Sequence, residues 1–241
     1  MKRPELTRSQ AWADIIVLLA VTAVSAVAVA GFASYVLKTD QLPLVIVIQG
    51  LVILAALRTM LAYRRQTWRD IGLKTLQSVD LGRGLLTLLA CVGANMLLTS
   101  SVMLVNPDML KQHAHNLMEV GERLDGGLPF AVLAAVILFV GIYEELTARG
   151  LFLSRCRTVL PGTWAPIMAS SVMFGLGHAY QGWLGVAQTT LIGVVLAYYT
   201  MRWGTLWPAI LAHAALDLTS LAVIRYATEH NLLLYGCLCP M

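Results

Sequence analysis

The chain has 241 residues, of which 58% are hydrophobic and 12% are charged, and its formal net charge is +4. Soluble domains carry about 25% charged residues, so this composition excludes an ordinary soluble protein and predicts an all-α, polytopic membrane helical bundle. The basic residues fall where membrane topology requires them, so the net charge indicates no nucleic-acid partner.

Seven apolar stretches are each long enough to cross a bilayer, which takes about 20 helical residues. We place these spans at about 12–37, 42–63, 85–105, 128–153, 164–180, 183–201 and 206–224. The first is not expected to be a signal peptide, because its apolar run of roughly 23 residues exceeds the 7–15 of a signal sequence. The tail after residue 225 is too short for another span, but it has room for a short eighth helix at the interface.

The connections 64–83 and 149–162 are the richest in Lys and Arg, and with seven spans they fall on the same side as the N-terminus. The positive-inside rule makes that side cytoplasmic. The segment 106–127 is acidic on balance, is expected to include a short helix and would face the other side. We divide the chain into N-terminal helices and loops (1–127), a core (128–225) and a short tail (226–241).

Two adjacent carboxylates, Glu144 and Glu145, lie near the end of the apolar stretch that begins at Leu128. Ionisable groups inside a span usually face a protein-lined or wet cavity and mark function. Glu145 and Arg149 are four residues apart and can pair on a helix, whereas Glu144 points about 100° away from Glu145. One carboxylate can therefore be structural while the other stays available for chemistry. The alternative is a charged cluster that reaches the membrane surface at a helix end.

Three more ionisable residues, His178, His213 and Asp217, lie inside the later spans. Glu144 precedes the turn at Pro161 by 17 residues and His178 follows it by 17, so antiparallel helices would place both at similar depth. His213 and Asp217 are four residues apart, on one face of the last span. The spacing predicts that a carboxylate and two histidines meet in one intramembrane cavity.

Such a set suits hydrolysis. A carboxylate in apolar surroundings can act as a general base on water, and a histidine can share that water. A second histidine with a polar neighbour can stabilise an oxyanion. The set also permits zinc, with Glu144, His178 and His213 as ligands and an open position for water. The sequence does not require zinc, because no His-Glu-x-x-His helix is present.

Three motifs in order resemble those of the CAAX-protease and bacteriocin-processing (CPBP, Abi) family of intramembrane endopeptidases. They are Glu144-Glu145-x-x-x-Arg149-Gly150, Phe174-x-x-x-His178 and His213-x-x-x-Asp217. The resemblance covers about residues 128–222, and the segment 67–73 is similar to one that often precedes the core of this family.

The resemblance implies a glutamic-type protease that needs no cofactor. The implied roles are water activation by Glu144 assisted by His178, oxyanion stabilisation by His213 and Asp217, and support of the site by Glu145, Arg149 and Phe174. The chain departs from the pattern at two positions. Ala148 stands where a larger apolar residue is common, and Asp217 replaces the Asn of the eukaryotic prenyl-protein proteases. An aspartate would instead orient His213 or carry a proton.

The leading functional hypothesis is an integral-membrane endopeptidase (CAAX prenyl protease-like) that cleaves peptides or protein tails near the membrane surface. A non-catalytic scaffold or bacteriocin-immunity protein of the same fold is the second, although a scaffold has no need for buried ionisable groups. A proton-coupled transporter ranks last, because the sequence shows no clear internal repeat. The expected partners are a peptide or protein-tail substrate and the lipid bilayer, and the expected location is a prokaryotic cell (inner) membrane. Leader or tail processing of a secreted peptide is favoured over prenylated substrates.

Overall fold

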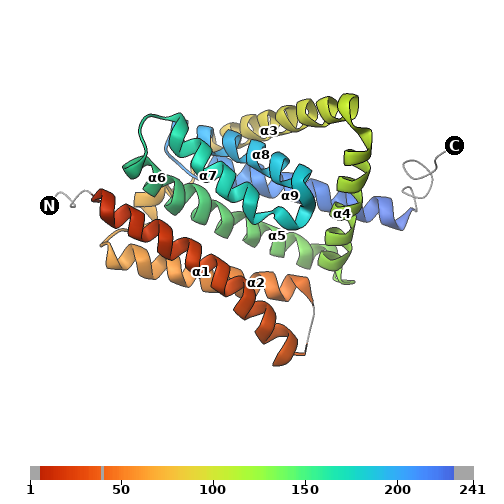
Figure 1. Ribbon diagram of the computed structural model, residues 1–241, viewed down its shortest axis with the longest axis horizontal. Coiled ribbons are helices and arrows are strands. Elements are labelled where there is room, and N and C mark those ends of the chain that lie inside the picture. The colour runs from red at the N-terminus through yellow and green to blue at the C-terminus, as the bar shows by residue number, and fades with distance from the viewer. Residues whose placement is uncertain (1–5, 39–40, 231–241) are drawn as a thin grey trace.

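The computed structural model describes residues 6–38 and 41–230, and in these ranges every regular element is a helix. The expected all-α bundle is confirmed (Figure 1). The α-helices are α1 (Arg8–Tyr35), α2 (Leu42–Tyr63), α3 (Ser78–Val105), α4 (Pro107–Asp125), α5 (Phe130–Glu145), α6 (Leu153–Val159), α7 (Trp164–Gly177), α8 (Gly182–Trp203) and α9 (Trp207–Glu229). Three shorter helices join them, namely η1 (Trp68–Ile71), η2 (Leu146–Phe152) and η3 (Ala179–Gln181).

Six helical segments of the described chain are long and apolar enough to cross a membrane, so this is a multi-pass membrane protein. They are α1, α2, α3, the continuous stretch Phe130–Val159, the stretch Ala179–Trp203, and Trp207–Ala227 within α9. The fifth predicted span, 164–180, is shorter than expected, because α7 has only 14 residues and is about 21 Å long. An apolar core of about 30 Å is longer than that helix.

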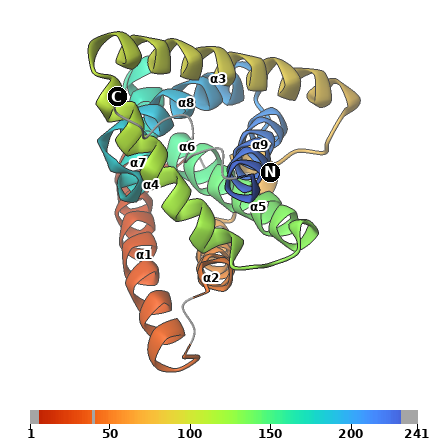
Figure 2. The same cartoon turned by 90° about the vertical axis from the view of Figure 1, so that its right-hand side faces the viewer.

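The connections between the long helices lie at two opposite ends of the bundle. The turns that contain the basic connections lie at the end where α1 begins, and α4 crosses the opposite end (Figures 1 and 2). Helix α4 fills most of the acidic segment 106–127, and its 19 residues make it longer than the short helix expected there. Which end faces the cytoplasm stays a prediction.

Helix α9 continues beyond the predicted boundary at 225, and an eighth helix in 231–241 would lie outside the described residues.

A buried ion cluster ties the N-terminal helices to the helix that follows the glutamate pair. Asp14 of α1 accepts from Arg64 Nη2 at 2.8 Å and from Arg155 Nε at 2.9 Å. Arg155 of α6 also donates to Gln66 Oε1 at 2.6 Å. Both oxygens of the aspartate are thus paired, which offsets the cost of burying it. The cluster fixes one end of the continuous helix that carries Glu144.

That helix changes its hydrogen-bonding pattern directly after Glu145. Residues Leu146–Phe152 form a π-helix, and the Leu153 N–H donates to the carbonyl of Ala148, five residues back. Such wide turns are rare and frequently occur at functional sites. The sequence pattern predicted an uninterrupted helix here. Gly150 lies in this turn, where an added Cβ would come 3.0 Å from Ile71 Cδ1, so the turn packs directly on the end of η1.

Candidate active site

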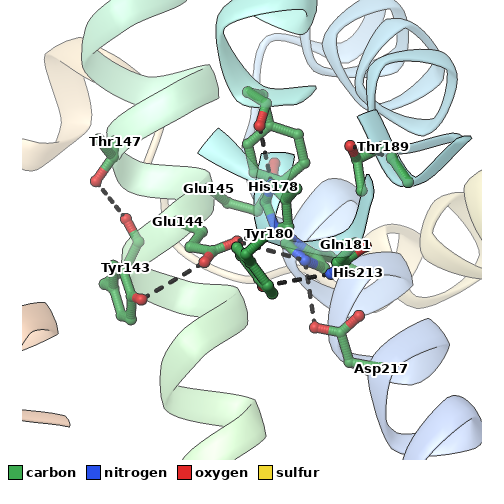
Figure 3. A network of polar contacts seen from close by, with 12 residues as sticks. Tyr143, Glu144, Glu145, Thr147, His178, Tyr180, Gln181, Thr189, His213 and Asp217 are labelled. Carbon is green, nitrogen blue, oxygen red and sulfur yellow. Dashed lines mark hydrogen bonds and ion pairs between the residues drawn. The ribbon is translucent and has the colours of Figure 1, made fainter. Parts of the chain in front are cut away.

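The predicted site residues come from three separate segments and meet around Glu144 (Figure 3). Glu144 ends α5 together with Glu145, His178 directly follows α7, and His213 and Asp217 lie on α9. Glu144 is the fifteenth of the 30 residues from Phe130 to Val159, which places it at the middle of that span. The structure therefore shows the convergence that the sequence spacing predicts.

One oxygen of Glu144 faces both histidines. Its Oε2 lies 3.9 Å from His178 Nε2 and 3.8 Å from His213 Nε2. These distances exceed those of a direct hydrogen bond and suit a bridging water. The Glu144 side chain is 20% exposed and that of His178 is 15% exposed, so both remain accessible at the middle of the span.

The backbone of α7 sets the proton arrangement of His178. Its Nδ1 lies 2.9 Å from the carbonyl oxygen of Phe174. A carbonyl can only accept, so Nδ1 carries the hydrogen and Nε2 of the neutral ring presents a lone pair. This nitrogen lies 3.9 Å from Glu144 Oε2, so the space between them is bordered by two hydrogen-bond acceptors.

Glu145 is completely buried and holds two partners with one oxygen. Its Oε1 lies 2.7 Å from Arg149 Nη1, so the predicted pair is present, and 2.8 Å from His213 Nδ1. The sequence did not predict the second contact. An ionised carboxylate only accepts, so His213 Nδ1 donates to it. This bond fixes the ring orientation and turns Nε2 toward Glu144, much as outer-shell carboxylates orient histidines in metal sites.

Asp217 contacts the other nitrogen of His213. Its Oδ2 lies 3.3 Å from His213 Nε2, four residues along the same helix, and its side chain is 40% exposed. His213 is thus placed between a buried carboxylate on Nδ1 and an accessible one on Nε2. This arrangement fits an aspartate that orients the histidine, although the exact role of Asp217 stays a prediction.

Phe174 forms the apolar centre of the cluster. The Arg149 guanidinium carbon lies 4.0 Å from the centre of its ring. The ring of His178 is 4.7 Å away and that of His213 is 5.8 Å away, in an edge-to-face arrangement. A cation over an aromatic face is attracted most strongly where water is excluded. Phe174 therefore fills the space between the buried ion pair and the two histidines.

A family model described as "Type II CAAX prenyl endopeptidase Rce1-like" matches residues 126–219. This segment of the chain is similar to the Rce1-like family. The match contains all seven predicted site residues, and it agrees with the family that the three motifs resemble. The matched family is a family of proteases, which supports a peptidase. No curated protein and no solved structure matches the chain.

Two tyrosines of the segment 126–219 lie beside predicted site residues, although the sequence analysis did not select them. The Tyr143 hydroxyl lies 3.5 Å from Glu144 Oε1, and the Tyr180 ring lies 5.8 Å from the His178 ring. Tyr143 is adjacent to Glu144 in the sequence, and Tyr180 is two residues from His178. This proximity is the one sequence signal that points to these tyrosines. Neighbouring residues on a helix do not normally face each other, so the signal was weak.

The zinc alternative needs Glu144, His178 and His213 to converge on one ion. Within residues 6–38 and 41–230, no group of three or more His, Cys, Asp or Glu side chains is arranged so that it could hold a metal ion. His213 already has its Nδ1 on Glu145 and its Nε2 beside Asp217. Whether the reaction uses a metal is therefore a question for the assay described below.

Proposed function

We propose that the protein is an intramembrane endopeptidase that hydrolyses peptide bonds near the membrane surface with a water activated by Glu144 and His178. The observation that carries this proposal is the pair of acceptors, Glu144 Oε2 and His178 Nε2, which lie 3.9 Å apart. A water about 2.8 Å from each can donate one hydrogen to each. Its lone pair is then free to attack a carbonyl carbon.

In the proposed reaction, the water oxygen bonds to the carbonyl carbon while its proton passes to Glu144. The carbonyl oxygen becomes an oxyanion, and His213 Nε2, when protonated, stabilises it. The C–N bond then breaks, and the leaving amine takes the proton held by Glu144. The water's second proton stays with the carboxylic acid product, and Glu144 is regenerated as a carboxylate. Glu145 and Asp217 keep the His213 ring in place on both sides.

We also propose that the substrate is a peptide or protein tail held at the bilayer, that no cofactor takes part, and that the protein resides in a prokaryotic cell membrane. The mid-span position and partial exposure of Glu144 support a substrate that reaches into the membrane. The name of the matched family mentions prenylated CAAX tails, and sequence considerations favour a leader or tail of a secreted peptide. The substrate set should include both kinds.

The test uses purified full-length protein in detergent and internally quenched peptides, with and without an S-farnesyl cysteine four residues from the C-terminus. We expect Glu144→Gln to lower kcat at least about 100-fold, because general-base catalysis contributes about 10²–10⁴. Glu119→Gln is the matched control, since Glu119 is an exposed residue of α4. Wild-type turnover by Glu144→Gln, or no cleavage of any peptide by the wild type, would refute the proposal.

Metal content and chelator sensitivity are measured on the same preparations. We expect activity that depends on Glu144, survives 1,10-phenanthroline and occurs without stoichiometric metal. Stoichiometric zinc with chelator-sensitive turnover would instead make Glu144, His178 and His213 ligands, and it would contradict the proposed use of Glu144 as the base.

A further inference from the structure

We propose that Tyr143 is a positioning residue for Glu144, and that α2 holds Tyr143 in the orientation this role requires. The inference rests on the proposed function, because it concerns how the water-activating carboxylate is aimed. It also gives α2, which lies outside the matched segment 126–219, a part in the geometry of the site.

The two oxygens of Glu144 have different surroundings. Oε1 lies 3.5 Å from the Tyr143 hydroxyl, whereas Oε2 faces His178 and His213. The hydroxyl can donate to an ionised carboxylate, which fixes the plane of the carboxyl group. The contact is long for a hydrogen bond, but catalytic hydrogen bonds are often long without substrate and shorten when it binds. Tyr143 thus leaves Oε2 directed at the space where we place the water.

Sequence adjacency alone does not bring these two groups together. Successive side chains on a helix point about 100° apart, so residues i and i+1 do not face each other. The Tyr143 ring packs against Gly50 of α2, and its hydroxyl contacts Glu144 (Figure 3 shows the pair). The residue is 8% exposed, and its ring is 5.5 Å from that of Phe139, so it has little freedom to turn.

Gly50 of α2 makes room for that ring. A Cβ added at Gly50 would lie 2.7 and 2.9 Å from Tyr143 Cδ1 and Cε1, and 2.6 Å from Phe139 Cε1. Cβ atoms essentially never come within 3.0 Å of such neighbours. A larger residue at this position therefore requires the rings of Tyr143 and Phe139, or α2 itself, to shift. We expect that shift to move the Tyr143 hydroxyl relative to Glu144.

The first test is Tyr143→Phe, which removes the hydroxyl and keeps the packed ring. We expect kcat to fall about 10- to 100-fold, since a hydrogen bond to a charged group has roughly that effect. The KM for the best-cleaved quenched peptide and the detergent Tm should stay unchanged, whereas a purely structural role would lower Tm. Tyr199→Phe is the matched control, because Tyr199 stacks on Trp203 of α8. Wild-type kcat in Tyr143→Phe would overturn the inference.

The second test is a double-mutant cycle with Gly50→Ala. If α2 acts through the Tyr143 hydroxyl, Gly50→Ala should lower kcat at least about 10-fold in the wild type, but less than about threefold in Tyr143→Phe. An equal loss in both backgrounds would mean that the helix contact matters only for packing, and it would overturn the role of α2. Gly93→Ala is the control, since an added Cβ there meets nothing within 4 Å.

A third measurement needs no substrate and so separates this inference from the proposed function. With 3-fluorotyrosine at position 143, we expect the ¹⁹F resonance to shift when Glu144→Gln is introduced, and not when Glu119→Gln is introduced. An unchanged resonance would refute the contact even if the enzyme is an active protease. A shifted resonance in a protein that cleaves no peptide would instead refute the proposed function and leave the contact in place.

Discussion

Replacing Arg149 should destabilise the protein far more than replacing the proposed catalytic base. The side chains of Arg149 and Glu145 are 1% and 0% exposed and are joined at 2.7 Å. Arg149→Ala leaves the Glu145 charge without its cation inside the bundle, and it also removes the cation from the Phe174 ring. Breaking a buried pair in this way costs about 3–5 kcal/mol.

The expected change in melting temperature follows from that free energy. For a chain of this size, about 1 kcal/mol corresponds to about 2–4 °C, so Arg149→Ala should lower the detergent Tm by about 6–20 °C. Glu144 makes no polar contact with its neighbours shorter than 3.5 Å among the described residues and is 20% exposed. We therefore expect Glu144→Gln to change Tm by less than about 4 °C.

The assay is a thermal melt in detergent. Unfolding is monitored by tryptophan fluorescence and by the loss of the monodisperse peak in size-exclusion chromatography. Glu145→Gln supplies the decisive background, because it removes the charge that Arg149→Ala would leave unpaired. Arg149→Ala should lower the Tm less in the Glu145→Gln background than in the wild type. A Tm loss no greater than that of Glu144→Gln, or an equal loss in both backgrounds, would refute the structural role assigned to Arg149.

Two further predictions concern the wide turn and the exposed aspartate. Gly150→Ala should lower the free energy of unfolding by about 1–3 kcal/mol, because the added Cβ would lie 3.0 Å from Ile71 Cδ1. Gly93→Ala should leave the free energy of unfolding unchanged or raise it. Thermal melts of the two variants, run in parallel, check both expectations. Asp217→Asn should lower kcat less than about 10-fold, because its amide can still contact His213, whereas His213→Ala should lower kcat at least about 100-fold. Equal losses in steady-state kinetics would give Asp217 a direct part in the reaction.

The predictions that held were those that depend on helical geometry and apolar run length. Six of the seven predicted spans are present in the described chain and follow from the length needed to cross a bilayer. The contacts Glu145–Arg149 and His213–Asp217 follow from the four-residue spacing. The matching depth of Glu144 and His178 could be obtained by counting from one turn, because both helices rise at the same rate.

Other features needed information that a single-sequence pattern does not carry. The contact between Glu145 and His213 joins residues 68 positions apart, so it depends on how α9 is rotated against α5. The π-helix after Glu145 has no periodic signature in seven residues, and it accompanies close packing of Gly150 on η1. Helix α7 ends at Gly177, three residues before the predicted boundary, and the short helix η3 follows it, a change of helix type that apolar content does not reveal.

In the proposed reaction, the rotation of about 100° between adjacent helical residues gives Glu145 a structural role and Glu144 a chemical one. Glu145 is fully buried and paired, whereas Glu144 is partly exposed and has only long contacts with the histidines. His213 connects the two, because its Nδ1 contacts Glu145 and its Nε2 faces Glu144. Variants of Glu144 should therefore lose turnover and variants of Arg149 should lose stability. Variants of His213 should lose both, since the same ring contacts the buried Glu145 through Nδ1 and presents Nε2, the atom that we propose stabilises the oxyanion.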